Sequence, residues 1–148
     1  MKIYKTQKEI EADIVDGVLK IRGDVKFEVS FSIEAKIIVE GGDIKAGDIK
    51  AGDIEASGNI EASGNIEAGD IEAWNIEARN IEARNIKAED IKARNIEARN
   101  IEARNIEVWN ISFYAVAFAY LSFKCKSIVG KRNNNKYFCL DKEVEITK

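Results

Sequence analysis

Hydrophobic and polar positions recur in a unit of five residues throughout residues 44–125. Each unit begins with a large apolar residue, almost always Ile, followed by Glu or Lys and then by Ala. In an extended chain, residues i and i+2 point to the same face, so each triplet directs two apolar side chains inward and one charge outward. The unit commonly ends with Gly or Arg and then Asn or Asp, types that suit corners. The pattern predicts very short strands joined by corners.

Two irregular units support this division. Residues 54–59 and 60–65 each contain six residues, and the extra one enters beside Gly, between Ala and Asn. A turn tolerates such an insertion, whereas within a strand it would exchange the two faces. A helix is excluded because, at about 3.6 residues per turn, a period of five would distribute the isoleucines around its circumference. We therefore predict a β-solenoid.

The outward charges favour four units per coil. Stacked residues lie about 4.8 Å apart, and like charges directly opposite each other are unfavourable. With four sides, two outward columns alternate in charge, and two all-acidic columns lie beside arginine corners. The acidic columns are Glu55, Glu77 and Glu97, and Glu61, Glu82 and Glu102; the corner arginines are Arg79, Arg84, Arg99 and Arg104. Trp74, Arg94 and Tyr114 would then stack at one corner as a cation–π column. This arrangement predicts about four regular coils.

The repeat resembles the pentapeptide-repeat family, both in its period and in the Asn or Asp before the large residue, as in residues 79–81 and 69–71. The resemblance covers a little over half of the chain. It implies an all-β, right-handed, four-sided β-helix. The family usually has a small residue two positions before the large one, but here Arg79 occupies that position and the small Ala83 follows Ile81. We therefore expect a variant of the family's corner.

The N-terminal residues 1–43 are expected to cap a single domain that spans residues 1–148. Thr6 and Glu9 have the spacing of a capping box, which predicts a short helix from Gln7 to about Asp13 with Ile10 buried. The alternative is an irregular polar segment. Residues 18–39 alternate strictly between apolar and polar, which indicates half-buried strands in wider first coils.

The C-terminal residues 126–148 are expected to form a second cap. The small inward position grows from Ala to Val108 and then to Phe113, Phe118 and Phe123, so the last coil must widen or be covered. Strands are predicted at residues 127–129, 137–140 and 143–146. The charged turns between them would block growth at the open edge.

The composition gives no support for catalysis. The chain has no His, so a Ser or Cys nucleophile would lack its usual base, and the Glu residues repeat with the solenoid. We predict a protein that is not an enzyme and has no cofactor. Cys125 and Cys139 are expected to be free thiols, and two cysteines without His make no zinc site. The N-terminus lacks the apolar core of a signal peptide, so we expect a cytoplasmic protein without a membrane span.

Polar corner residues would form columns of their own. In a four-sided coil Asp48, Asp70 and Asp90 share one corner, where a cation could bind. Lys50, Lys92 and backbone donors are expected to satisfy these carboxylates instead, and we predict no metal site. The asparagines are expected to form amide ladders, with Asn75 on Asn95 and Asn80 on Asn100.

These features favour a non-enzymatic scaffold that binds a protein partner or another copy of itself. The expected contact surface comprises Glu77, Glu82, Glu97, Glu102, Arg79, Arg84, Arg99, Arg104, Trp74 and Trp109. The resemblance implies an alternative, a DNA mimic that binds a type II topoisomerase such as DNA gyrase through the acidic columns. Direct binding of nucleic acid is not expected at a net charge of −3. One basic run is expected to be a solvated cap, with phosphates or the acidic body of another copy as the alternative contacts: Lys124, Lys126, Lys131, Arg132 and Lys136.

Overall fold

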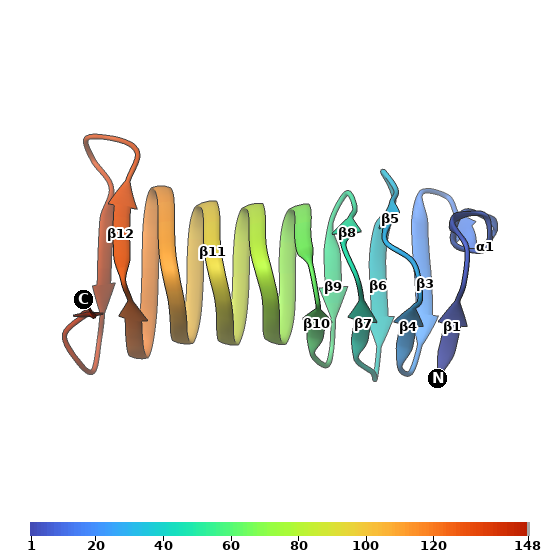
Figure 1. The fold of residues 1–148 in the computed structure, drawn as a ribbon, viewed down its shortest axis with the longest axis horizontal. Coiled ribbons are helices and arrows are strands. Elements are labelled where there is room, and N and C mark those ends of the chain that lie inside the picture. Colours follow the sequence, from blue (N-terminus) through green and yellow to red (C-terminus); the bar gives the residue numbers. More distant parts are fainter. Residues whose placement is uncertain (148) are drawn as a thin grey trace.

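The computed structural model describes residues 1–147, which form one rod-shaped β-solenoid (Figure 1). The chain winds about one axis in about seven turns, and its two ends lie at opposite ends of the rod. The predicted β-solenoid is confirmed. The elements are β1 (Lys2–Tyr4), α1 (Gln7–Ala12), β2 (Ile14–Val15), β3 (Val18–Arg22), β4 (Val25–Phe27), β5 (Phe31–Ser32), β6 (Lys36–Glu40), β7 (Ile44–Ala46), β8 (Ile49–Lys50), β9 (Ile54–Ala56), β10 (Ile60–Ala62), β11 (Asn65–Cys125), β12 (Ser127–Gly130), β13 (Lys136–Cys139) and β14 (Glu145–Ile146).

Each regular coil has three sides, not the predicted four. Ile60 pairs in parallel with Ile44 and with Ile76, so one coil separates every third unit. In the later coils the corner amides repeat at an interval of 15 residues. The alternation of charge was a weak criterion because an exposed ion pair contributes only about 1 kcal/mol or less. Backbone ladders and corner hydrogen bonds determine the number of sides instead.

We number the sides by one regular coil: residues 76–78 lie on side one, 81–83 on side two and 86–88 on side three. Side one continues toward the N-terminus through β10, β7, β4 and β1. Side two continues through β8 and β5. Side three continues through β9, β6 and β3. The single long strand β11 covers all three sides because its corners keep an extended backbone.

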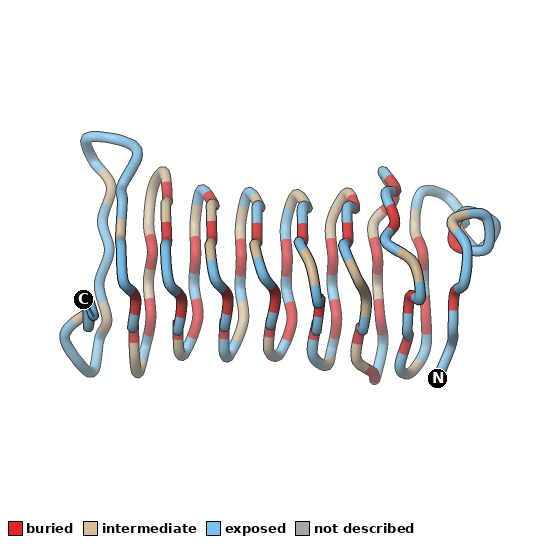
Figure 2. Tube along the Cα trace, in the orientation of Figure 1, coloured by how far each residue is buried: buried red, intermediate tan, exposed pale blue. Residues whose placement is uncertain are grey.

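The core is a column of isoleucines along the axis. Ile44, Ile101 and Ile106 have no exposed surface, and each central Glu or Lys points outward. Figure 2 shows buried positions recurring along every coil. Burying one such side chain contributes roughly 1.5 to 3 kcal/mol. Stability therefore accumulates from coil to coil.

The N-terminal coils are longer than the later ones. Val18 pairs with Lys36, an interval of 18 residues. The extra residues of the two six-residue units lie outside strands β9 and β10, at the corners, as the sequence predicted.

Corners in this part of the chain combine Asp with Gly. The amide of Asn65 donates to Asp48 Oδ1 at 2.7 Å, and a Cβ at Gly64 would lie 2.0 Å from the same oxygen. Equivalent bonds join Asn59 to Asp43 and Asp70 to Asp53. Glycine is needed here because the carboxylate fills the space of a side chain.

The N-terminal cap contains the predicted helix. Thr6 Oγ1 accepts a hydrogen bond from the amide of Glu9, and the Glu9 carboxylate accepts one from the amide of Thr6 at 3.2 Å. Ile10 is fully buried. The capping box is therefore confirmed. After the helix, Asp16 and Gly17 adopt positive φ angles in the turn between the antiparallel strands β2 and β3.

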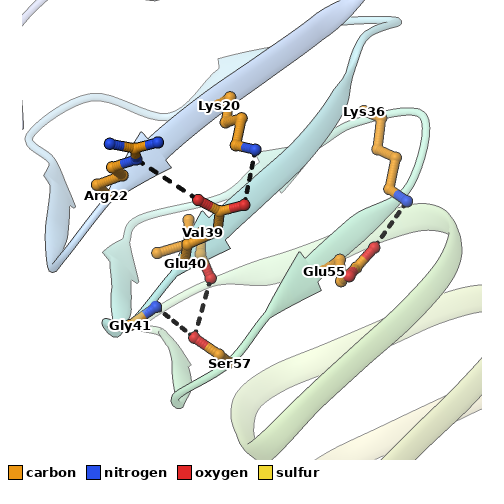
Figure 3. A network of polar contacts seen from close by, with 8 residues as sticks. All are labelled: Lys20, Arg22, Lys36, Val39, Glu40, Gly41, Glu55 and Ser57. Atoms are coloured by element: carbon orange, nitrogen blue, oxygen red, sulfur yellow. Dashed lines mark hydrogen bonds and ion pairs between the residues drawn. The ribbon is translucent and has the colours of Figure 1, made fainter.

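Ion pairs cover the outer surface of these first coils. On side three, Glu40 accepts from Lys20 at 2.7 Å, and Lys36 lies 2.8 Å from Glu55 on the next coil (Figure 3). At the adjacent corner Ser57 Oγ donates to the carbonyl of Val39. Successive coils are thus joined by side chains as well as by the backbone.

Inward and outward positions exchange on the last units of β11. Phe113 and Phe123 are buried as predicted, but Phe118 is only half-buried, and Ala117 and Ala119 are fully buried instead. The predicted inward position of Phe118 is wrong because strict alternation continues beyond Phe113, without the two-residue corner that shifts the phase in earlier units.

Three short strands then complete the rod. β12, β13 and β14 each pair in parallel with β11. Cys125 and Cys139 are free thiols, and burial raises the pKa of the Cys125 thiol.

Candidate functional site

The candidate contact residues are distributed over all three sides of the rod. Glu77 lies on side one, Glu82 and Glu97 lie on side two, and Glu102 lies on side three. The two predicted all-acidic columns are therefore wrong. The outward columns are Lys45, Glu61, Glu77, Lys92 and Glu107 on side one; Lys50, Glu67, Glu82, Glu97 and Ser112 on side two; and Glu55, Glu72, Lys87 and Glu102 on side three.

Side two carries a row of three successive carboxylates, Glu67, Glu82 and Glu97, which we call the acidic row. Its two ends are neutralised by lysines. Lys50 Nζ lies 2.6 Å from Glu67, and Lys131 forms an ion pair with Glu97. Glu82, between them, forms no ion pair within residues 1–147. Within this part of the chain, Glu82 therefore carries the unpaired negative charge of the acidic row.

The ion pairs at the ends of the acidic row shift the pKa values of Glu97, Lys131 and Lys50. The hydrogen bond from Lys131, assisted by that from the Tyr114 hydroxyl, lowers the pKa of Glu97 below its ordinary value. The same pair raises the pKa of Lys131. The pair between Lys50 and Glu67 likewise raises the pKa of Lys50. Glu97, Lys131 and Lys50 are therefore charged near neutral pH.

Arginines line both long edges of side two. Arg79 and Arg94 stand at the corner with side one, in a groove that they share with Trp109. Arg84 and Arg99 stand at the corner with side three, where Arg84 lies 3.8 Å from Asp70. We call these four residues the edge arginines. They give side two an alternation of charge across its width.

Arg104 is separate from the edge arginines. It lies at the third corner, between sides three and one, 3.6 Å from Glu89. The candidate set therefore divides into a cluster on side two and scattered residues elsewhere.

An amide ladder forms one edge of side two. The Nδ2 atoms of Asn80, Asn95 and Asn110 each donate to the Oδ1 of the asparagine one coil earlier, at 2.7 Å in each case. A groove of about 570 Å³ runs between this ladder and the acidic row. The ladder fixes the spacing of the coils, so the acidic row is held rigidly.

The amide ladders were predicted in kind but with the wrong partners. Asn95 bonds to Asn80 and not to Asn75, and Asn100 bonds to Asn85 and not to Asn80. The error follows directly from the number of sides.

Both tryptophans are exposed corner residues, as predicted, but the proposed column of Trp74, Arg94 and Tyr114 is wrong. Trp74 lies at the corner between sides three and one, where its amide donates to the carbonyl of Gly58 one coil earlier. Trp109 lies between two cations on its own corner, with Arg94 5.0 Å and Lys126 4.4 Å from its ring centre. Trp109 is thus the tryptophan associated with side two.

The C-terminal basic run folds back onto the body. Lys131 and Arg132 lie over the ring of Tyr114, and Lys124 pairs with Glu145 at 3.6 Å. Sequence reasoning missed these contacts, although Trp109 and Tyr114 precede Lys126 and Lys131 by one coil. Most of the run therefore contacts aromatic or acidic groups of this chain.

The predicted column of Asp48, Asp70 and Asp90 does not exist, because the three residues occupy three different corners. Asp48 bonds to Asn65, Asp70 to Asn85 and Asp90 to Asn105. In residues 1–147 no group of three or more His, Cys, Asp or Glu side chains is placed to hold a metal ion.

Comparisons with known proteins identified no relative of this chain. A scan against protein-family models, a search of curated proteins and a search of solved structures each found no match to the chain. In the described part of the chain, no helix is long and apolar enough to cross a membrane. The chain is a three-sided β-solenoid, and six of the ten candidate contact residues lie on side two or at its corners: Glu82, Glu97, Arg79, Arg84, Arg99 and Trp109.

Proposed function

We propose that this protein is a non-enzymatic scaffold that binds a protein partner through side two. The observation that supports this most directly is the acidic row held between two rows of arginine. Such a surface offers carboxylate acceptors and guanidinium donors at a repeat of about 4.8 Å. Arginine is enriched at protein interfaces because it combines a planar charged group with an apolar stem.

Rigidity supports the same proposal. Backbone ladders and amide ladders hold side two, so little conformational freedom is lost when a partner binds. Arg79 and Arg99 form no ion pair within residues 1–147, and Glu82 is equally unengaged. These groups are available to charges of opposite sign on a partner, which would give selectivity and a fast, salt-dependent association.

A four-residue charge variant tests this proposal. The test variant replaces Arg79, Arg84, Arg94 and Arg99 by Gln; the control replaces Lys20, Arg22, Lys26 and Lys45 by Gln. Both variants remove four positive charges, but the control changes other coils. A photo-crosslinker at position 82 identifies the protein bound to side two, and its affinity is then measured with purified components. We expect binding to persist in the control and to weaken at least tenfold in the test variant. Equal binding by both variants, or no crosslinked protein, would refute the assignment.

A DNA mimic directed at a type II topoisomerase is a second candidate. The observation that favours it is the acidic row, which places three carboxylates in succession along the rod. The edge arginines oppose it because they reduce the negative potential that a mimic needs. The test is inhibition of gyrase supercoiling by the protein and by a variant with Glu67, Glu82 and Glu97 replaced by Gln. Inhibition that disappears in the variant would establish mimicry, and no inhibition by either would exclude it.

A further inference from the structure

The last two rungs of side three carry an apolar patch in place of charges. In earlier coils the outward column of this side is Glu55, Glu72, Lys87 and Glu102. The exchange of faces at the end of β11 turns Val116, Phe118 and Tyr120 outward, because their neighbours Ala117 and Ala119 are fully buried. The surface of side three thus changes from charged to aromatic within one coil.

The next rung extends this patch. β13 pairs with β11 so that Phe138 stands beside Phe118 and Lys136 beside Val116. The ring centres of Phe118 and Phe138 are 4.7 Å apart, and Tyr120 lies 4.5 Å from Phe118. Phe138, Tyr120 and Leu140 remain 41%, 43% and 62% exposed. We call Val116, Phe118, Tyr120, Phe138 and Leu140 the aromatic patch.

Opposite charges border the aromatic patch on its two sides along the rod, Glu102 on the coil before it and Lys136 on its outer rung. Lys136 begins the outer rung and has no ion-pair partner within residues 1–147. Tyr120 ends the inner rung, and its hydroxyl donates to Glu102 at 2.9 Å. A two-fold axis in the plane of the contact, perpendicular to the line that joins Lys136 and Glu102, sets Lys136 of each copy opposite Glu102 of the other. An apolar centre with complementary charges at its rim is a self-complementary surface.

We propose that the aromatic patch is the contact surface of a two-fold symmetric homodimer. Exposed, contiguous apolar groups on an otherwise charged protein mark an interaction site. A second copy is favoured over a lipid surface because the groove beside Tyr120 is lined by the carboxylates of Glu72, Glu89 and Glu102, whereas membrane-binding faces combine apolar residues with several basic ones. The contact lies apart from the acidic row, so its test does not depend on the function proposed for side two.

The mass of the 148-residue protein in solution, measured over a range of concentrations by sedimentation, tests the proposal. We expect a monomer–dimer equilibrium. Leu140→Lys places a charge in the patch and should weaken dimerisation at least tenfold. Val129→Lys is the matched control, because Val129 is 51% exposed on the same end of the rod but lies on β12, beside Ser112 of side two. Both changes are at exposed positions, and circular dichroism confirms that each variant is folded.

A charge exchange tests the geometry of the dimer. Lys136→Glu and Glu102→Lys should each weaken dimerisation, and the double variant should restore it. A monomer at all concentrations would overturn the proposal. Dimerisation that survives Leu140→Lys, or mass that grows without limit, would also overturn it, because the contact would then lie elsewhere or fail to close. Co-sedimentation with anionic lipid vesicles, with no dimer in their absence, would assign the patch to a membrane surface instead.

Discussion

Replacing Asp90 by Asn should stabilise the protein, because Asp90 interrupts an amide ladder. At the corner between sides three and one, Asn75 Nδ2 donates to Asn59 Oδ1 at 2.8 Å. Asp90 lies one coil after Asn75, and one coil after that Asn105 Nδ2 donates to Asp90 Oδ1 at 2.6 Å. A carboxylate has no N–H to offer to the preceding rung. The Oδ1 atom of Asn75 is consequently buried without a hydrogen-bond partner.

The size of the effect follows from this one atom. A buried acceptor without a partner costs about 1 to 3 kcal/mol. Asn at position 90 supplies the missing donor and keeps the acceptor used by Asn105. The bond from Asn105 loses its charge assistance, which offsets part of the gain. We therefore expect a net gain of about 1 kcal/mol in the free energy of unfolding, equivalent to about 2 to 4 °C in Tm for a chain of this size.

Urea unfolding at neutral pH, followed by circular dichroism, measures this gain. Asp70→Asn is the control, because it removes the same charge from a ladder position. Asp70 already accepts from Asn85, and its own amide donates to Asp53. Within residues 1–147 the new amide of Asp70→Asn finds no buried acceptor that lacks a partner. The control should therefore not increase the free energy of unfolding. An unchanged or lower midpoint for Asp90→Asn would refute the reasoning, as would an equal gain in both variants.

Three further changes test other parts of the structure. Gly64→Ala should destabilise the fold by about 1 to 3 kcal/mol, because the new Cβ displaces the carboxylate of Asp48; an unchanged Tm would contradict the close approach of 2.0 Å. Ile101→Ala should cost about 2 to 5 kcal/mol in urea unfolding, since Ile101 is fully buried; a cost below that of an exposed substitution would place it outside the core. The pKa of Glu97 is lowered mainly by Lys131, so its stabilisation is complete above the ordinary carboxyl range and is lost as pH falls through the lowered pKa. Because this pair is largely exposed, the loss should be below about 1 kcal/mol, and Glu97→Gln should remove this part of the acid dependence of the urea midpoint.

The local structure could be predicted from the sequence because it depends on neighbouring residues. The Ile-x-Ala triplet determines which side chains point inward, and Thr6 with Glu9 determines the start of α1. The number of sides could not be predicted in this way. A five-residue unit has the same local pattern in a three-sided and in a four-sided coil. The angle at each corner makes the difference, and it depends on contacts between coils.

The charge criterion failed because it gave weight to weak interactions. In the real coils Glu61 stacks beside Glu77, an unfavourable contact that the exposed surface tolerates. A stronger signal was present in the corner residues. Gly58, Gly64 and Gly69 each follow an aspartate by about one three-sided coil, and each makes room for that aspartate's carboxylate.

The aromatic patch could not be recognised from the repeat for a different reason. Phe118 continues the series of Phe113 and Phe123, so its spacing indicates an inward side chain. A single change of phase in the corner after Phe113 reverses it. Ala117 and Ala119 occupy the buried positions instead, and the five-residue pattern does not show this change.

The amide ladders fix the number of residues by which the rod can lengthen without disturbing its faces. Each regular rung matches the one 15 residues earlier, so duplication of 15 residues lengthens the rod by about 4.8 Å and leaves every face intact. Duplication of five residues would instead rotate all later residues by one third of a turn. The glutamates of one face would then continue the column of another. In such a chain, gene duplication can extend a binding surface only in whole coils.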